Sequence, residues 1–187
     1  MYGLVVVGFS AGGIEPMRAL LAGLGPDYPL PLAVVTHLPQ GSGAGFARLF
    51  SSPAALPMAF VSDKQAIVPG RAWFAPPGYH LLVESQVCFA LSVDAPVKFV
   101  RPSIDVLFDS AARAFDKRLI AVTLYGANSD GAEGMAGVRQ RGGMTVALAT
   151  PEGSSDPLSA AVRRQVEVDY CVGIGEIIAL LQAVRQL

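Results

Sequence analysis

The sequence predicts an α/β protein with a doubly wound, mostly parallel sheet, helices on both faces and a small antiparallel β-hairpin insert. Short apolar runs rich in β-branched residues alternate with longer segments whose apolar residues recur at helical spacing. The run at residues 119–124 is apolar without interruption, which is typical of a strand buried on both faces of a parallel sheet. Because no internal repeat or obvious linker breaks this alternation, we expect residues 1–187 to form a single domain.

The first elements follow from simple periodicity. The helical segment has its apolar residues at positions 17, 20, 21 and 24, which share one face. In order, we expect a strand at 4–7, a helix at 14–24, a strand at 32–36 and a short helix at 44–50.

The stretch from residue 59 to residue 91 has a different character. Short β-like runs at 72–74, 81–83 and 87–89 are separated by Pro-Gly and Pro-Pro-Gly turns. We therefore interpret the whole stretch as the antiparallel insert, with a hairpin tip at residues 84–86.

The second half of the chain returns to strand–helix alternation. A helix begins after Ser103, a favourable N-cap residue, and its apolar positions recur at helical spacing. After it we expect a strand at 119–124, a helix at 131–141, a strand at 145–149, a helix at 158–164, a strand at 169–172 and a helix at 176–186.

Composition excludes several classes of protein. The net charge of −1 argues against an electrostatic nucleic-acid binder, and no apolar run approaches the ~20 residues that span a bilayer. The first residues enter a strand directly and show no secretory leader, so we expect a cytoplasmic protein that does not insert into membranes. The two cysteines, Cys88 and Cys171, are expected to be buried thiols, with a bridge as the less favoured reading, and they make no metal motif. We expect neither a metal nor a cofactor.

Ser10 occupies the most informative position in the chain. It lies between a β-branched run and a helical pattern, in the segment G-F-S-A-G-G at residues 8–13, which fits the G-x-S-x-G nucleophile elbow. The same turn could bind a dinucleotide or be a plain structural turn. The glycine spacing is not G-x-G-x-x-G, however, and the second strand ends in Thr36-His37 without the acidic residue that would bind a ribose.

The predicted architecture brings three polar residues to one edge. Ligands of such sheets bind beyond the carboxyl ends of the strands. Ser10, His37 and Asp130 follow three different strands at that edge, and these residue types can form a nucleophile, a base and an orienting carboxylate. The alternatives are a structural role for His37 and an ordinary N-cap or turn role for Asp130. His80, within the insert, is interpreted as structural.

Five motifs together resemble the catalytic domain of CheB-type chemoreceptor methylesterases (protein-glutamate methylesterase/deamidase), nearly from end to end. G-F-S-A-G-G at 8–13 is similar to the family's G-A-S-[TA]-G-G. R-P-S-I-D-V-L-F at 101–108 matches its R-P-S-[VI]-D-x-L-F. The others are T-H-L-P at 36–39, F-A-P-P-G-Y-H at 74–80 and G-A-N-S-D-G-A-E-G at 126–134.

The resemblance implies a function and roles for particular residues. Ser10 would be the nucleophile, His37 the base and Asp130 its orienting partner, while the backbone N–H of Ala127 would stabilise the oxyanion. Ala11, Arg101 and Asn128 are candidate substrate-binding residues. For Arg101 we expect a place at the rim, with a slight preference for a structural ion pair to Asp105 over substrate docking. The implied substrate is a methylated glutamate on a chemoreceptor or receptor-like protein, with glutamine deamidation through the same acyl-enzyme.

Three departures from the family pattern favour an alternative. Ala127 and Asn128 replace the methionine and second glycine of G-M-G, and we expect Asn128 to adopt the left-handed conformation that glycine would take. The loop at residues 150–158 differs from the family's S-x-x-x-G-M-P. The sequence shows no receiver domain, which implies a separate regulatory protein. The alternative is therefore a catalytically impaired regulatory or binding module, and a weaker one is a nucleotide-binding protein.

Overall fold

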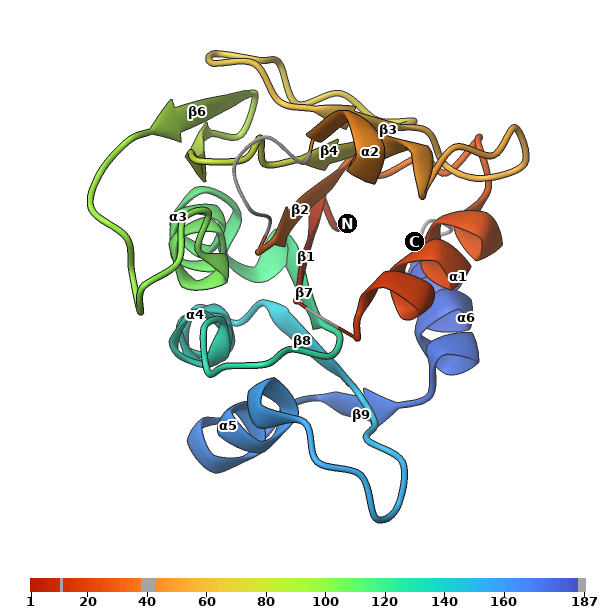
Figure 1. Cartoon of the computed structure of the whole chain (residues 1–187), viewed down its shortest axis with the longest axis vertical. Coiled ribbons are helices and arrows are strands. Elements are labelled where there is room, and N and C mark those ends of the chain that lie inside the picture. The colour runs from red at the N-terminus through yellow and green to blue at the C-terminus, as the bar shows by residue number, and fades with distance from the viewer. Residues whose placement is uncertain (11, 38–42, 185–187) are drawn as a thin grey trace.

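The computed structural model describes residues 1–10, 12–37 and 43–184, and within them seven parallel strands form one sheet (Figure 1). The sheet has the order β3-β4-β2-β1-β7-β8-β9, so the chain starts at its centre and winds outward in both directions. The predicted doubly wound sheet is confirmed. Its strands are β1 (Leu4–Phe9), β2 (Leu32–Thr36), β3 (Met58–Phe60), β4 (Ala72–Phe74), β7 (Leu119–Thr123), β8 (Met144–Leu148) and β9 (Tyr170–Val172).

Helices cover both faces of this sheet. Figure 1 shows α3, α4 and α5 on one side of it and α1 and α6 on the other. Successive side chains of β1 alternate between two buried cores, since Val6 belongs to the core on the α3 side and Val7 to the core on the α1 side. The helices are α1 (Ile14–Leu24), α2 (Gly43–Arg48), α3 (Ile104–Phe115), α4 (Ala132–Gln140), α5 (Pro157–Gln165) and α6 (Ile174–Val184).

The antiparallel insert is smaller than the sequence predicts. Among the described strands, β5 (His80–Ser85) and β6 (Cys88–Ser92) form an antiparallel hairpin, to which an isolated bridge adds Ala66 beside Cys88. Residues 72–74 are instead strand β4 of the main sheet, parallel to both β2 and β3. The prediction was wrong there because three residues are too short to show a periodicity, and turn signals give no information on which strand a run pairs with.

Two other expectations can be compared with the structure. Both cysteines are free, but Cys171 is exposed and Cys88 only half-buried, so the expected burial was wrong for Cys171. No helix in the described part of the chain is both long and apolar enough to cross a membrane.

Helix α3 packs unusually close to the central strand. A Cβ atom added at Gly8 would lie 2.3 Å from Cγ2 of Ile104, the first residue of α3. Glycine at position 8 therefore allows the start of α3 to approach the carboxyl end of β1, where Ser10 follows.

Gly8→Ala should destabilise the protein, because the added methyl group has no space beside Ile104. Overpacking of this kind costs about 1–3 kcal/mol of unfolding free energy. Gly137→Ala is the matched control, because Gly137 lies in α4 with nothing within 4 Å of an added Cβ. It should stabilise the protein by roughly 0.5–1 kcal/mol. Urea unfolding of both variants measures the contrast, and equal effects would contradict this packing.

Candidate active site

Ser10 lies in a tight turn between β1 and α1. Its backbone N–H donates to the carbonyl of Tyr125 at 2.9 Å, and its carbonyl accepts from Gly13 N–H at 3.0 Å. Gly12 has a φ of 88°, and a Cβ at Gly13 would lie 2.6 Å from Cβ of Phe9. The turn therefore requires glycine at both positions, and it holds Ser10 at the carboxyl end of the central strand.

The register of β1 and β2 relates Ser10 to His37. Gly8 pairs with Val35 and Phe9 pairs with Thr36, so one further step sets Ser10 level with His37 on the neighbouring strand. Neighbouring strands lie about 4.8 Å apart. Although both residues are described, no hydrogen bond joins the Ser10 hydroxyl to His37. Catalytic hydrogen bonds are often long in sites without substrate, so this geometry leaves the pair able to close.

His37 is joined directly to Asp130. The distance from His37 Nε2 to Asp130 Oδ2 is 2.8 Å, and the Asp130 side chain is fully buried while that of His37 is 14% exposed. These two members of the predicted trio come from β2 and from the loop between β7 and α4. The structure therefore brings together residues that are 93 positions apart in the sequence.

Asp130 also caps helix α3. Its carboxylate accepts hydrogen bonds from the Ser103 hydroxyl at 2.7 Å, Ile104 N–H at 2.6 Å and Asp105 N–H at 3.2 Å. Burial by itself would raise the pKa of Asp130, but the hydrogen bonds from His37, Ser103 and the two backbone N–H groups lower it below its ordinary value. Asp130 is therefore a carboxylate that can only accept, so a neutral His37 ring that donates to it carries its proton on Nε2 and has Nδ1 as its acceptor.

Asp105 is a residue that the sequence analysis did not place in the site. Its Oδ1 accepts from Gly131 N–H at 2.9 Å and Gly134 N–H at 2.7 Å, at the start of α4. Burial raises the pKa of Asp105, and the negative charge of Asp130 adds to this, while Lys98 and Gly134 oppose it. Its position in the first turn of α3 was the one sequence signal that could have suggested a capping role.

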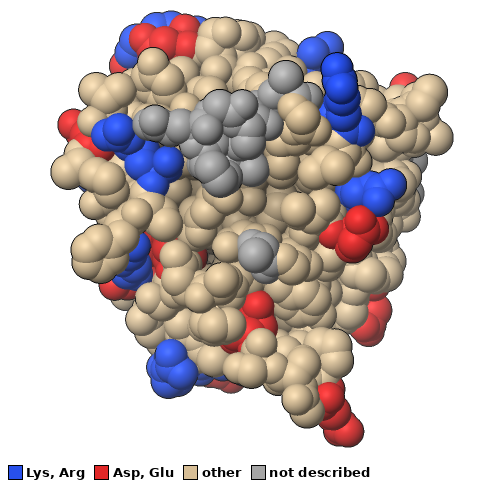
Figure 2. Space-filling view, viewed as in Figure 1, with Lys and Arg blue, Asp and Glu red and all other residues tan. Residues whose placement is uncertain are grey.

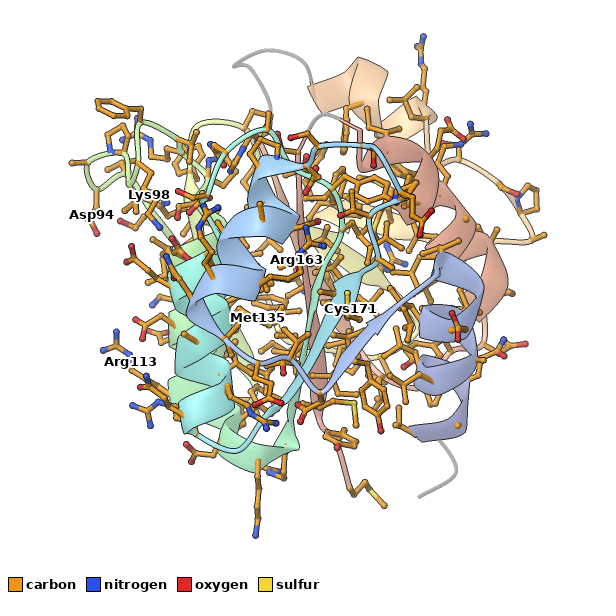
Figure 3. All side chains as sticks on the ribbon, turned by 90° about the horizontal axis from the view of Figure 1, so that it is seen from below. Asp94, Lys98, Arg113, Met135, Arg163 and Cys171 are labelled. Atoms are coloured by element: carbon orange, nitrogen blue, oxygen red, sulfur yellow. The ribbon has the colours of Figure 1, made fainter. Side chains whose placement is uncertain are left out.

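The expected ion pair between Arg101 and Asp105 was wrong. Lys98 takes the place of Arg101, with its ammonium 2.7 Å from Asp105 Oδ2. The Arg101 guanidinium instead donates to the carbonyls of Val93 and Asp94 at 2.7 and 2.9 Å. The reason is a tight turn at residues 97–100, which folds Lys98 back over the starts of α3 and α4 (Figure 3).

The loop at residues 126–131 is hydrogen-bonded to the start of α5. Gly126 N–H donates to Asp156 Oδ2 at 2.8 Å, and Gly126 carbonyl accepts from Leu158 N–H at 3.0 Å. Asp156 also accepts from Ser159 N–H at 2.8 Å as the N-cap of α5. The altered 150–158 loop is visible in the sequence, whereas this contact was not predicted, although Asp followed by Pro is an N-cap signal.

Asn128 does not adopt the left-handed conformation that we expected. Its φ is not positive, and its Oδ1 instead accepts from the N–H of Asp130 at 3.1 Å. The left-handed residue of the loop is Gly131, with a φ of 112°. The side chain of Asn128 thus stabilises a local turn just before Asp130, and no special backbone conformation is needed at position 128.

Two other residues singled out in the sequence are Ala11 and His80. Ala11 lies outside the described residues. His80 is buried and bonds to Ser103 N–H at 3.1 Å and to the Ala95 carbonyl at 3.2 Å, as expected of a structural histidine. In the parts of the chain that the structure describes, no three His, Cys, Asp or Glu side chains are grouped to hold a metal ion. On the face shown in Figure 2, acidic and basic side chains are interspersed in small groups.

Comparisons with known proteins agree with this geometry. The family model described as CheB methylesterase matches residues 5–181. A protein of Anaeromyxobacter dehalogenans, named protein-glutamate methylesterase/protein-glutamine glutaminase 2, is 36% identical over 98% of this chain and 53% of its own length. A Leptospira interrogans protein, to which the same two activities are provisionally assigned by name, is 36% identical over 96% of this chain and 93% of its own length.

A solved structure agrees as well. The crystal structure of the Thermotoga maritima CheB methylesterase catalytic domain superposes with a TM-score of 0.90 and 27% identity, covering 98% of this chain and 99% of that domain. Several other curated relatives are longer, and the chain spans about half or less of their length. The match of the family model over most of the chain, with these relatives, shows that the chain belongs to the CheB methylesterase family of carboxylic ester hydrolases.

Proposed function

We propose that this protein hydrolyses glutamate methyl esters on a chemoreceptor or receptor-like protein, using Ser10, His37 and Asp130, and that it deamidates glutamine by the same route. The observation that carries the proposal is the 2.8 Å hydrogen bond from His37 to the buried Asp130, together with the strand register that sets residue 37 beside residue 10. The activity names of the relatives support the reaction and the substrate class.

The geometry suggests which atoms move the proton. Since Nε2 of His37 is engaged by Asp130, Nδ1 accepts the proton of the Ser10 hydroxyl as its oxygen attacks the ester carbonyl. The same proton is then given to the leaving methoxide, which departs as methanol. Water, activated by Nδ1, releases the acyl group as a carboxylate, and Asp130 stays ionised throughout and stabilises the imidazolium. For glutamine the leaving group is ammonia.

The oxyanion would be stabilised by the backbone N–H of Ala127. This residue follows Gly126, whose N–H and carbonyl are both fixed by α5 through Asp156 and Leu158. A donor held in this way costs no reorganisation when negative charge develops on the substrate oxygen. The replacement of a methionine side chain by Ala127 leaves that backbone donor in place.

The partners follow from the same proposal. The protein would act in the cytoplasm on a methylated receptor, under the control of a separate regulatory protein. Asn128 remains a substrate-binding candidate because it belongs to the same loop as Ala127. Arg101 is better explained as a residue that positions the 93–101 segment, since its guanidinium is engaged by main-chain carbonyls.

One observation favours the alternative of a regulatory module without turnover. The Ser10 hydroxyl and His37 are not hydrogen-bonded, so activation of the nucleophile depends on a small closing movement. Methanol release by wild type and by Ser10→Ala separates the two functions.

Ser10→Ala should reduce methanol release from a methyl-esterified receptor at least a thousandfold, because the nucleophile is lost. The unfolding free energy should change by less than about 1 kcal/mol. Ser52→Ala, at an exposed position, is the control and should leave the rate unchanged. A wild-type protein that releases no more methanol than Ser10→Ala would support the regulatory module instead.

Asp130→Asn should lower kcat roughly 10²–10⁴-fold, because an amide no longer fixes the imidazole tautomer or stabilises its cation. The pKa of Asp130 is lowered on folding, so its carboxylate stabilises the native state above about pH 4, and this contribution is lost as the pH falls further. The stability gap between wild type and Asp130→Asn should therefore stay constant at neutral pH and narrow as the pH falls below about 4 in urea titrations.

Asp105→Asn is the matched control for that pH dependence. The pKa of Asp105 is raised on folding, so its contribution to stability falls as the pH rises, which is the opposite sign. Parallel pH trends in the two variants would contradict the assigned directions.

Asp156→Ala should lower kcat strongly and lower the unfolding free energy only modestly. The change frees the N–H of Gly126 next to the proposed oxyanion donor, for which a loss of about 10²–10³-fold in kcat is expected if the donor turns away. Loss of the N-cap of α5 should cost about 1 kcal/mol. Asp156→Asn, which can still cap the helix, should recover most of the stability. An unchanged kcat in Asp156→Ala would rule out this support for the loop.

A further inference from the structure

The turn at residues 97–100 presents an aromatic side chain to solvent. Phe99 is fully exposed, and Val93 in the same segment is also exposed. Val97 and Val100 exchange two backbone hydrogen bonds, of 3.1 and 2.9 Å, around Lys98 and Phe99. A large apolar side chain with no contact inside the chain contributes nothing to folding.

The backbone of this turn is strained as well. Lys98 has a φ of 48° and Phe99 a φ of 67°, and both positive values are required by a two-residue turn of this hand. Such turns strongly favour Asn and Gly, because other residues pay a steric penalty in the left-handed region. Phe99 therefore adopts a backbone conformation that is unfavourable for it, and its ring is exposed to solvent.

The strained turn is nevertheless fixed on both sides. The Lys98 ammonium lies 2.7 Å from Asp105 Oδ2 and 3.0 Å from Glu133 Oε1. On the other side the Arg101 guanidinium donates to the carbonyls of Val93 and Asp94. These contacts hold the turn in one conformation, so a partner that binds Phe99 would lose little conformational entropy in ordering it.

The turn also adjoins the candidate site. The Lys98 ammonium contacts the Ser129 carbonyl at 3.5 Å, next to Asp130, and Asp105 links it to the start of α4. Figure 3 shows Asp94 and Lys98 at the end of α3 where the helix starts, with Arg113 toward its other end. The turn that carries Phe99 thus lies beside the loop that carries Asp130, the hydrogen-bond partner of His37.

We propose that Phe99 is a docking residue for the protein substrate, and that its ring inserts into an apolar surface flanking the esterified glutamate. The inference rests on the proposed function. A glutamate methyl ester is small, so only a macromolecular substrate can occupy the site and also cover an exposed ring on the neighbouring turn. Aromatic side chains, phenylalanine among them, are enriched in the buried core of protein–protein interfaces.

The test compares two substrates with one set of variants. The first substrate is a chemoreceptor cytoplasmic fragment carrying radiolabelled methyl esters, and the second is p-nitrophenyl acetate. Phe99→Ala should lower kcat/KM for the fragment at least tenfold, mainly through KM, and should change the rate on the small ester less than twofold. Val87→Ala is the control, because Val87 is also apolar and exposed but lies at the hairpin tip, beside the far end of α3.

Phe99→Asn adds a second, independent readout. Asparagine tolerates positive φ, so this variant should melt at a higher temperature than wild type. Its kcat/KM for the receptor fragment should nevertheless fall as much as that of Phe99→Ala. Full activity of either variant on the fragment would overturn the proposal, and so would equal losses on both substrates. If wild type releases no more label than Ser10→Ala, the proposed function itself fails, and the docking proposal with it. A wild type that is active and a Phe99→Ala that is equally active would overturn docking alone.

Discussion

The site depends on one buried carboxylate. Asp130 has no exposed surface, and a carboxylate in that position would be strongly unfavourable without partners. Four donors surround it: the ring of His37, the hydroxyl of Ser103 and two backbone N–H groups at the start of α3. The same contacts that make the charge tolerable also fix the imidazole, join β2 to α3 and orient the loop after β7. The catalytic geometry that we propose is thus inseparable from the folding of this end of the sheet.

A second carboxylate, Asp105, caps the helix that follows Asp130. Asp130, just before α4, caps α3, while Asp105, in the first turn of α3, accepts from N–H groups at the start of α4. Each helix therefore has its positive end neutralised by an acid from the other, which holds the two starts together. The two acids repel one another, and Lys98 offsets this by binding Asp105. The close approach of Ile104 to Gly8 then joins the helix pair to β1, beneath Ser10.

Local patterns in the sequence were sufficient for most elements and for the expectation that Ser10, His37 and Asp130 lie at one edge of the sheet. Apolar runs identified the long strands, and the rule that ligands bind at the carboxyl ends of parallel strands selected Ser10, His37 and Asp130. The errors have two physical causes, long-range pairing and local turn geometry. Strand β4 and the contact from Asp156 to Gly126 depend on partners distant in sequence, which residue types alone do not specify. The Lys98 ion pair joins residues only seven positions apart, and it depends on the turn at residues 97–100. Asn128 was misjudged because a side-chain hydrogen bond, not a left-handed backbone, stabilises its turn.

The central claim is that ionised Asp130 fixes His37 with its proton on Nε2 and its Nδ1 free to activate Ser10. Nitrogen-15 NMR of the histidine ring, in protein labelled at histidine, reports directly which nitrogen carries the proton. At a pH where the ring is neutral, His37 should show a protonated Nε2 and an unprotonated Nδ1, and the Nε2 proton should lose its downfield shift in Asp130→Asn. A neutral ring protonated on Nδ1, or a spectrum unchanged by Asp130→Asn, would contradict the account.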